Sequence, residues 1–388
     1  MTTKRNYFPN LDDHSYERYG NLSNVPANVS YLSALPGEHV PLSTIGFKWH
    51  SASHHLAIEN FQPPQYYEDY VMTATCSDRM QSLQAAQMER MMQLHKITGN
   101  APESLIEIGC GDGSFLSHAH RYLPRVIGVE PSARFAEEAR QRGFEVLVSF
   151  VSGDVQLTTE TFDCFASRQV FEHLPDPLDV LSGIRRMLNP GAIGLIEVPN
   201  GYRALRLRRF FEFFPDHVNY YSVNSLVALA SEAGFNVISC HESFGGDYLE
   251  LWLRHEPEIA LRAKELNLVR EQVCDALTCK ISNLRELDHS IMIWGCGAKT
   301  LSILSACSKE MLDSISGIID SDPHKHGRFV PNTAIQVLAP ERAVELSPDI
   351  VFVLALSYRE EIALAIRKTL PTCRGIYTLD DYGTVTEL

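Results

Sequence analysis

The residue types best suited to chemistry form a glycine-rich turn that follows a short apolar run. The run reads SLIEIGCGDGSF, and its acid and glycines stand at alternate positions: Glu107, Gly109, Gly111 and Gly113. Glycines let the backbone turn tightly and come close to a ligand. A second apolar run ends on Glu130, whose carboxylate can accept hydrogen bonds from both hydroxyls of a ribose. This succession of strand, glycine turn, helix, strand and acid is typical of a nucleotide-type cofactor site.

The spacing of the glycines separates two kinds of cofactor. Dinucleotide sites favour GxGxxG, in which the third glycine packs the helix on the sheet. Here the spacing is GxGxG, with an acid two positions before the first glycine. This form resembles motif I of the class I methyltransferases, which use S-adenosylmethionine (SAM), a cofactor that carries an ammonium, a sulfonium and a ribose but no phosphate. A glycine turn in an unrelated α/β protein is the alternative that the turn alone leaves open.

A later stretch resembles the same family. The sequence SRQVFEHLPDPLDVLSGIRRMLNPGAIGLIEVPN is similar to the family's strand, His-Leu-x-Asp-Pro turn, helix, L-x-P-G-G turn and strand, with Ala192 in place of the last glycine. The resemblance implies that the glycine turn and its acid hold SAM, that Glu130 binds the ribose, and that Asp154 contacts the adenine. It also implies that four residues at the end of the strand lie over the methionyl part: Gln169, Phe171, Glu172 and His173.

The resemblance extends to two-domain sugar C-methyltransferases, from about residue 65 to the end of the chain. The segment FFPDHVNYYS is similar to their Y-H-E-H-F-x-Y-F-S, so Asp216 and His217 match the Glu-His pair that the family uses for proton abstraction, while Phe214 and Pro215 replace a tyrosine and a histidine. The segments WGCGAK and IIDSDPHKHGRFVPNTAIQVLAPE are similar to the C-terminal domain of that family. The segment YYEDYVMTATCSDRM resembles its tyrosine segment, in which Tyr70 would reach the methionine carboxylate.

This resemblance predicts a SAM-dependent methyltransferase that acts on a carbon atom of a small molecule in secondary or sugar metabolism. C-methylation needs a base to make a carbon nucleophile beside a carbonyl, and a histidine oriented by a carboxylate suits that task. The predicted catalytic residues are His217 as the base, Asp216 as the group that orients it, and Tyr70. The alternative is that His217 only lines the pocket. The paired cysteines of the family's N-terminal zinc domain are missing from this chain.

Three other functions stay open. The enzyme could methylate nitrogen or oxygen. It could act as a cyclase on SAM itself, with attack by the cofactor's own amine and loss of methylthioadenosine, as in azetidine-2-carboxylate synthases. A non-catalytic binding module is the third, against which the intact glycine motif and Glu130 argue.

The order of strand-like and helix-like runs predicts how these residues are positioned. Alternating runs between about residues 101 and 250 predict a parallel sheet flanked by helices, with an antiparallel edge. A second glycine turn, WGCGAK, leads through a helix and a strand to Asp320. We therefore expect an α/β fold, a Rossmann-like class I methyltransferase core with a second, smaller Rossmann-like C-terminal domain. The expected parts are an irregular N-terminal cover segment (1–70), the SAM-binding domain (71–255), a linker helix (256–288) and the C-terminal domain (289–388).

The composition of the chain limits the kinds of partner that we expect for this protein. The 388 residues are 45% hydrophobic and carry a net charge of −14, which argues against nucleic acid as a partner. No apolar run is long enough to span a bilayer, and the N-terminus lacks a signal-peptide core. The nine cysteines contain no CxxC pair, so we expect reduced thiols in the cytoplasm and no metal. The histidines of WHSASHHLAIE are the one pattern that suggests a metal, but no cysteine or acid cluster accompanies them. A homodimer is compatible with the sequence.

Overall fold

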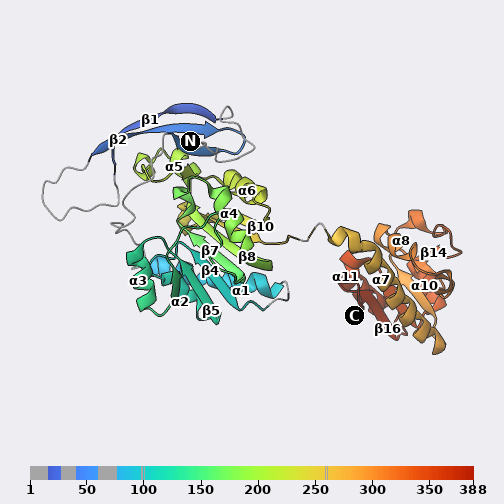
Figure 1. Cartoon of the computed structure of the whole chain (residues 1–388). Coiled ribbons are helices and arrows are strands. Elements are labelled where there is room, and N and C mark those ends of the chain that lie inside the picture. The colour runs from blue at the N-terminus through green and yellow to red at the C-terminus, as the bar shows by residue number, and fades with distance from the viewer. Residues whose placement is uncertain are drawn as a thin grey trace. The chain divides into compact units, whose positions relative to one another are not determined.

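The computed structural model describes residues 16–27, 41–59, 77–97, 99, 101–257, 259 and 261–388. The chain divides into two compact units, Met1–Glu258 and Ile259–Leu388, which are coloured along the chain in Figure 1. None of the helices in the described ranges is long and apolar enough to cross a membrane. Each unit is built on its own sheet.

The main sheet of the first unit has seven strands in the order β10-β11-β8-β7-β4-β5-β6. Strands β4 to β8 are parallel, whereas β11 pairs antiparallel with both β8 and β10. The order β6-β5-β4-β7-β8 is that of a doubly wound sheet, which confirms the predicted Rossmann-like core. The bounds are β4 (Ser104–Ile108), β5 (Arg125–Val129), β6 (Glu145–Leu147), β7 (Phe162–Arg168), β8 (Leu188–Pro199), β10 (Asn236–Ser243) and β11 (Tyr248–Arg254).

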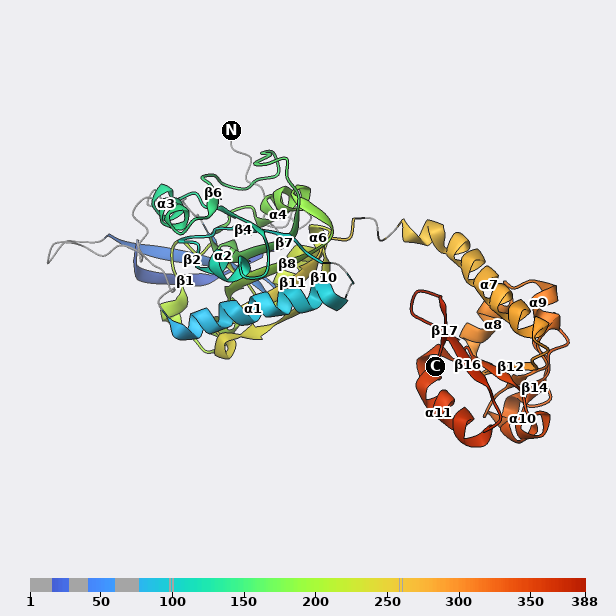
Figure 2. The same cartoon turned by 90° about the horizontal axis from the view of Figure 1, so that it is seen from below.

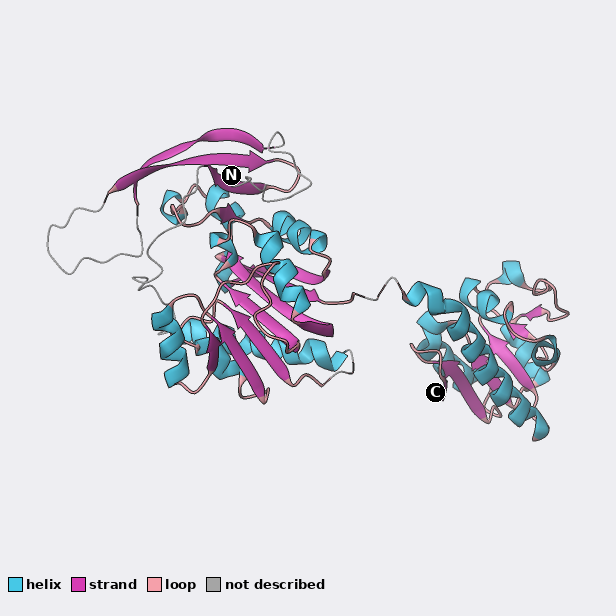
Figure 3. Ribbon diagram, in the orientation of Figure 1, coloured by secondary structure: helices cyan, strands magenta, loops and turns pink. Residues whose placement is uncertain are grey.

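Helices cover both faces of this sheet (Figures 2 and 3). Helices α1, α2 and α3 pack on one face, and α4 and α6 pack on the other. In α1, Met88 and Met91 are fully buried in the core beneath the sheet. Their burial explains the methionine-rich helical pattern of the sequence. The bounds are α1 (Asp78–Ile97), α2 (Ser114–Ala119), α3 (Ala133–Gln141), α4 (Pro177–Arg186) and α6 (Val223–Glu232).

The helices that follow β4, β5 and β7 bring their first turns towards the carboxyl ends of these strands. Helix α2 begins directly after Gly113. The side chains of Ser132 and Asp176 cap α3 and α4 by accepting backbone N–H hydrogen bonds, which satisfies donors that have no partner inside the helix. Because the strands are parallel, their carboxyl ends share one edge, and ligands of doubly wound folds bind at that edge.

A second, antiparallel sheet lies in the first unit, in the order β1-β2-β3-β9. Its strands are β1 (Tyr16–Pro26), β2 (Leu42–His50), β3 (His55–Glu59) and β9 (Asn219–Tyr220). The described part of the first 59 residues is therefore a regular sheet, and not the irregular cover that the sequence suggests. Strand β3 pairs with β9, and Phe47 packs against Phe213. Strand β9 thus ties the segment after His217 to the N-terminal sheet.

The second unit has six strands in the order β14-β13-β12-β15-β16-β17, all parallel except β17. The sequence predicts a smaller Rossmann-like sheet in this unit, and the observed strand order confirms that prediction. The strands are β12 (Ile291–Trp294), β13 (Ile318–Ile319), β14 (Val337–Leu338), β15 (Ile350–Val353), β16 (Gly375–Leu379) and β17 (Val385–Glu387). The helices are α7 (Arg262–Glu286), α8 (Ala298–Leu304), α9 (Lys309–Asp313), α10 (Pro340–Leu346) and α11 (Arg359–Thr369).

Helix α7 corresponds to the stretch interpreted from the sequence as a linker helix. Its residues Leu277, Ile281 and Leu284 are buried in the core of the second unit, so the helix is part of that unit. In the same unit Asp320 accepts hydrogen bonds from the backbone N–H groups of Cys296 (2.7 Å) and Asp322 (2.9 Å) and from Lys325 Nζ (2.9 Å). The acid therefore closes the glycine turn and is itself paired with a cation.

Candidate active site

The glycine turn after β4 needs glycine at each of its three predicted positions. The φ angles of Gly109, Gly111 and Gly113 are 74°, 52° and 80°, in the left-handed region that other residues rarely adopt. A Cβ on Gly109 would lie 2.3 Å from Cγ2 of Val170, whereas a Cβ on Gly111 would meet nothing within 4 Å. Gly109 therefore permits a close approach to the neighbouring strand end, and Gly111 faces open space.

Glu130 holds this turn in place. Its carboxylate accepts hydrogen bonds from the backbone N–H groups of Gly111 (3.0 Å) and Ser132 (2.9 Å). Burial raises the pKa of Glu130, and the two N–H donors act in the opposite direction. Each carboxylate oxygen can accept more than one hydrogen bond, so the group can still receive a ligand hydroxyl.

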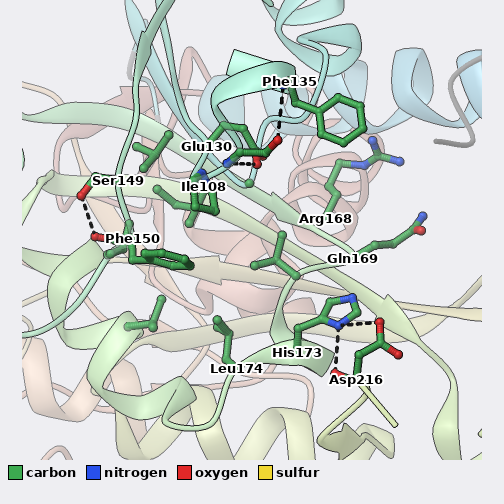
Figure 4. A pocket seen from close by; sticks show the side chains of 17 residues that line it. Ile108, Glu130, Phe135, Ser149, Phe150, Arg168, Gln169, His173, Leu174 and Asp216 are labelled. Atoms are coloured by element: carbon green, nitrogen blue, oxygen red, sulfur yellow. Dashed lines mark hydrogen bonds and ion pairs between the residues drawn. The ribbon is translucent and has the colours of Figure 1, made fainter. Parts of the chain in front are cut away.

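A cavity of about 160 Å³ lies beside the turn, and Figure 4 shows the side chains around it. We call it the first cavity. Of the residues predicted to bind a cofactor, it is lined by Gly109, Glu130, Gln169 and His173. Asp154 is exposed in the turn Gly153-Asp154 and does not line it. Residues that the sequence did not single out also line it: Phe135, Ser149, Phe150, Val151 and Arg168.

Glu107 lies on β4 below the turn and is 2% exposed. Its Oε2 atom has no hydrogen-bond partner among the described residues, and burial raises the pKa of this carboxyl well above its usual value. A buried acceptor without a partner is costly and is suited to a donor or a cation brought by a ligand.

A second cavity, of about 530 Å³, shares three lining residues with the first: Gln169, His173 and Asp216. We call it the second cavity. It is also lined by His217 and by the aromatic side chains of Phe214, Tyr220 and Tyr248. Its acidic lining residues are Glu172, Glu212, Asp216 and Asp247, and none of the described residues that line it is a lysine or an arginine.

His173 and Asp216 meet at the wall between the two cavities. His173 Nδ1 lies 3.0 Å from the backbone oxygen of Asp216 and 3.6 Å from its Oδ2. A carbonyl oxygen only accepts, so Nδ1 carries the proton and Nε2 keeps its lone pair. Burial lowers the pKa of His173, and the charge of Asp216 opposes that shift. His173 is therefore a neutral imidazole that the backbone oxygen of Asp216 holds in one orientation, with the carboxylate of the same residue at ion-pair distance.

His217, the predicted base, contacts His173 ring to ring, edge on, with 4.7 Å between the ring centroids. Burial lowers its pKa well below the usual value. Asp216 and His217 are neighbours in the sequence, but they lie in a tight turn in which the backbone N–H of His217 donates a hydrogen bond to the backbone oxygen of Phe214. This turn separates the two residues, so Asp216 interacts with His173 instead. One ligand atom each from Glu172, His173 and His217 lie within 4.8 Å of one another.

The remaining predicted residues are placed as follows. Tyr70 lies outside the described residues. Glu172 is buried in a 3₁₀ turn, Phe171–His173, and lines the second cavity. The three histidines of the WHSASHH stretch have protein partners: His50 contacts Ser53, His55 contacts Asn219, and His54 stacks on Tyr202.

Two family models match this chain. A methyltransferase domain matches residues 64–240, and a C-methyltransferase C-terminal domain matches residues 263–372. This protein is therefore a SAM-dependent methyltransferase. The second match confirms the resemblance to two-domain C-methyltransferases, and the cofactor of this methyltransferase is SAM, as predicted.

Individual relatives are similar over different lengths. The methyltransferase is 26% identical over 284 residues to the C-methyltransferase NovU of Streptomyces niveus, which covers 66% of this chain and 67% of NovU. It is 26% identical over 104 residues to a ubiquinone biosynthesis O-methyltransferase of Vibrio cholerae, of which it spans only 42%. Among solved structures, the N-methyltransferase NodS from Bradyrhizobium japonicum matches 46% of this chain and 98% of NodS, with 17% identity and a TM-score of 0.37.

Proposed function

We propose that this methyltransferase transfers the methyl group of SAM to a carbon atom beside a carbonyl group of a small molecule. One observation carries the proposal: His173 and Asp216 line both cavities. A base at this wall would reach an acceptor that is held in the second cavity while SAM occupies the first. The match to a C-methyltransferase C-terminal domain and the similarity to NovU support carbon as the acceptor atom.

The residues around the first cavity fit SAM. We assign the ribose hydroxyls to Glu130, which lines the first cavity, and the methionyl ammonium to Glu107, which is buried on β4 beside Ile108 and Gly109 of the lining and whose Oε2 has no described partner. The open space above Gly111 suits close contact between backbone and ligand. Gln169, which lines both cavities, is assigned to the methionyl side, while the roles of Gly113, Asp154, Glu172 and Tyr70 in cofactor binding stay predictions. When bound, SAM supplies a methyl group made electrophilic by the adjacent sulfonium.

We assign the base to His173. Its Nδ1–H is held by Asp216, so its unprotonated Nε2 would accept the proton of the acceptor's C–H bond. The carboxylate of Asp216 would then stabilise the imidazolium that forms. The base predicted from the sequence, His217, lies next to it in the second cavity and forms no ion pair with a carboxylate among the described residues, whereas His173 Nδ1 lies 3.6 Å from Oδ2 of Asp216. Asp216 thus keeps its predicted orienting role, but towards a different histidine.

The lining of the second cavity bears on the acceptor. Its described lining residues include four acids, but Glu212 and Asp247 pair with Arg209 and Arg203, and burial raises the pKa of Glu172 well above its usual value. Most of the negative charge is therefore compensated, and a keto compound with or without phosphate groups fits this lining. We place the reaction in sugar or secondary metabolism in the cytoplasm, which the free thiols of all described cysteines support.

Two measurements test the proposal. With [13C-methyl]SAM and a panel of keto sugars, NMR of the product distinguishes a methyl group on carbon from one on nitrogen or oxygen. With S-adenosylhomocysteine and D2O, the base alone should exchange the acceptor's C–H for C–D. We expect His173→Asn to lose this exchange by about a hundredfold or more while still binding cofactor, and the exposed His324→Asn to keep it.

Different outcomes would contradict different parts of the proposal. Exchange lost in His217→Asn but kept in His173→Asn would return the base to His217. A methyl group on nitrogen or oxygen would refute C-methylation. Methylthioadenosine formed from SAM alone would instead support the cyclase reaction on the cofactor.

A further inference from the structure

Arg168, the last residue of β7, is a buried cation in the first cavity. Its side chain is 8% exposed, and Figure 4 shows it among the residues that surround the cavity. Of the described residues that line this cavity, it alone carries a permanent positive charge. It does not line the second cavity, so its charge is directed to the cofactor's side of the site.

The guanidinium of Arg168 is held in one position. Its Nη2 lies 3.1 Å from Glu197 Oε1 on β8 and 3.2 Å from Met80 Sδ in the first turn of α1. Its guanidinium carbon lies 5.2 Å from the centre of the Phe115 ring. A guanidinium fixed by an ion pair and an aromatic ring loses little conformational freedom when a ligand binds.

Glu197 is itself fixed by a buried network. It accepts hydrogen bonds from Gln87 Nε2 (2.6 Å) and from Gln169 Nε2 (3.2 Å). Gln87 also donates to Glu250 (3.0 Å), which lies directly opposite Glu197 on the neighbouring strand β11. Glu197 is fully buried, so this network orients Arg168 from the interior of the protein.

One N–H group of the Arg168 side chain makes none of these contacts. Its Nε is buried and has no hydrogen-bond partner among the described residues. A buried N–H without an acceptor is costly, and the cost is regained when a ligand supplies the acceptor. The unsatisfied donor and the permanent charge both call for an anion.

We propose that Arg168 binds the α-carboxylate of the methionyl part of SAM. The strand order places β4 and its glycine turn between β5, which leads to Glu130, and β7, which ends at Arg168. A cofactor that crosses the glycine turn with its ribose at Glu130 therefore brings its amino acid end towards Arg168. The α-carboxylate is the one anionic group of SAM. This assignment concerns the cofactor and stands whether the acceptor atom is carbon, nitrogen or oxygen.

With Arg168 as the partner of the α-carboxylate, the site binds SAM in preference to related molecules that lack this carboxylate. Methylthioadenosine lacks the whole amino acid part, and decarboxylated SAM lacks only the carboxylate. For both, Arg168 would stay desolvated without its anion. A charge-assisted hydrogen bond to a buried guanidinium corresponds to about ten- to a hundredfold in affinity.

Calorimetry of the full chain tests this without any acceptor. We expect the wild type to bind SAM about ten- to a hundredfold more tightly than decarboxylated SAM. Arg168→Met should bring the two affinities to within about threefold, by weakening SAM alone, and Arg168→Lys should keep part of the preference. Binding of decarboxylated SAM by Arg168→Met also shows that this variant is folded. The control is Arg125→Met, which removes an arginine from the opposite end of β5, where it pairs with Glu145 and Glu160.

Glu197→Gln tests the positioning network. It should weaken SAM several-fold and leave the affinity for decarboxylated SAM and methylthioadenosine unchanged, whereas a purely structural role would weaken all three ligands together. Equal wild-type affinities for SAM and decarboxylated SAM would overturn the proposal. It would also be overturned if Arg168→Met kept the wild-type preference.

Discussion

Replacing Gly109 by alanine tests whether the glycine turn is set by steric contact with the next strand. The substitution places a Cβ 2.3 Å from Cγ2 of Val170 at a φ of 74°. The left-handed backbone alone costs about 1–2 kcal/mol for a residue with a Cβ. Relief of the overlap adds about 1–3 kcal/mol, because the turn or the end of β7 must shift. We therefore expect a loss of about 2–5 kcal/mol in the stability of the first unit.

A matched control separates the two contributions. Gly99 also has a φ of 74°, but a Cβ placed there meets nothing within 4 Å. Gly99→Ala should therefore cost only the backbone strain. In thermal unfolding followed by calorimetry, at about 2–4 °C per kcal/mol, Gly109→Ala should melt about 2–12 °C below Gly99→Ala. Gly109→Ala should also bind S-adenosylhomocysteine at least about tenfold more weakly than the wild type does. Gly99→Ala should bind it as tightly as the wild type.

A double substitution shows whether Val170 is the cause. In Gly109→Ala combined with Val170→Ala, the overlapping atom is gone, so the two substitutions should be non-additive by about 1–3 kcal/mol. If Gly109→Ala melts and binds like Gly99→Ala, or if the two costs simply add, the close approach of the turn to β7 does not determine the site.

Three further predictions concern protons and metals. Since burial lowers the pKa of His173, kcat/KM should stay level as pH falls from 8 to about 6.5. Asp216→Asn, which removes the carboxylate that raises this pKa, should move the acid limb to lower pH; an unchanged limb would contradict the pairing. EDTA should leave turnover unchanged, whereas Zn²⁺ should inhibit by binding Glu172, His173 and His217, and metal-dependent turnover would refute His173 as a free base. Burial lowers the pKa of His55 from 6.5 to about 3, so the stability it gives is complete above pH 6.5 and is lost as pH falls towards 3, by about 2 kcal/mol at pH 5. In His55→Gln, urea unfolding should lose this dependence, because glutamine still donates to Asn219 but does not titrate.

Features encoded by neighbouring residues could be predicted from the sequence. The glycine turn with Glu130 follows from residue types at fixed spacing, because positive φ angles demand glycine and the acid closes the turn through backbone N–H groups. The strands β4 and β5 are mostly apolar because helices cover both faces of the sheet. In each case the physical requirement acts within a few residues or along one strand.

Features that depend on distant partners could not be predicted. The N-terminal sheet depends on the pairing of Leu56 with Tyr220, and the sequence between them gives no sign of it. The sequence suggests that Asp216 orients its neighbour His217, but the turn directs the interactions of Asp216 to His173, which is 43 residues away. Arg168 has no local pattern at all, because its partner Glu197 lies on another strand.

The acids at the ends of the second strands have a structural role that is independent of any ligand. Glu130 and Asp320 both close their glycine turns by accepting two backbone N–H groups. Such an acid therefore contributes to folding by itself. In the second unit Lys325 also neutralises it. A glycine turn closed by an acid is thus a requirement of the fold first, and its presence in a Rossmann-like unit does not by itself identify a cofactor site.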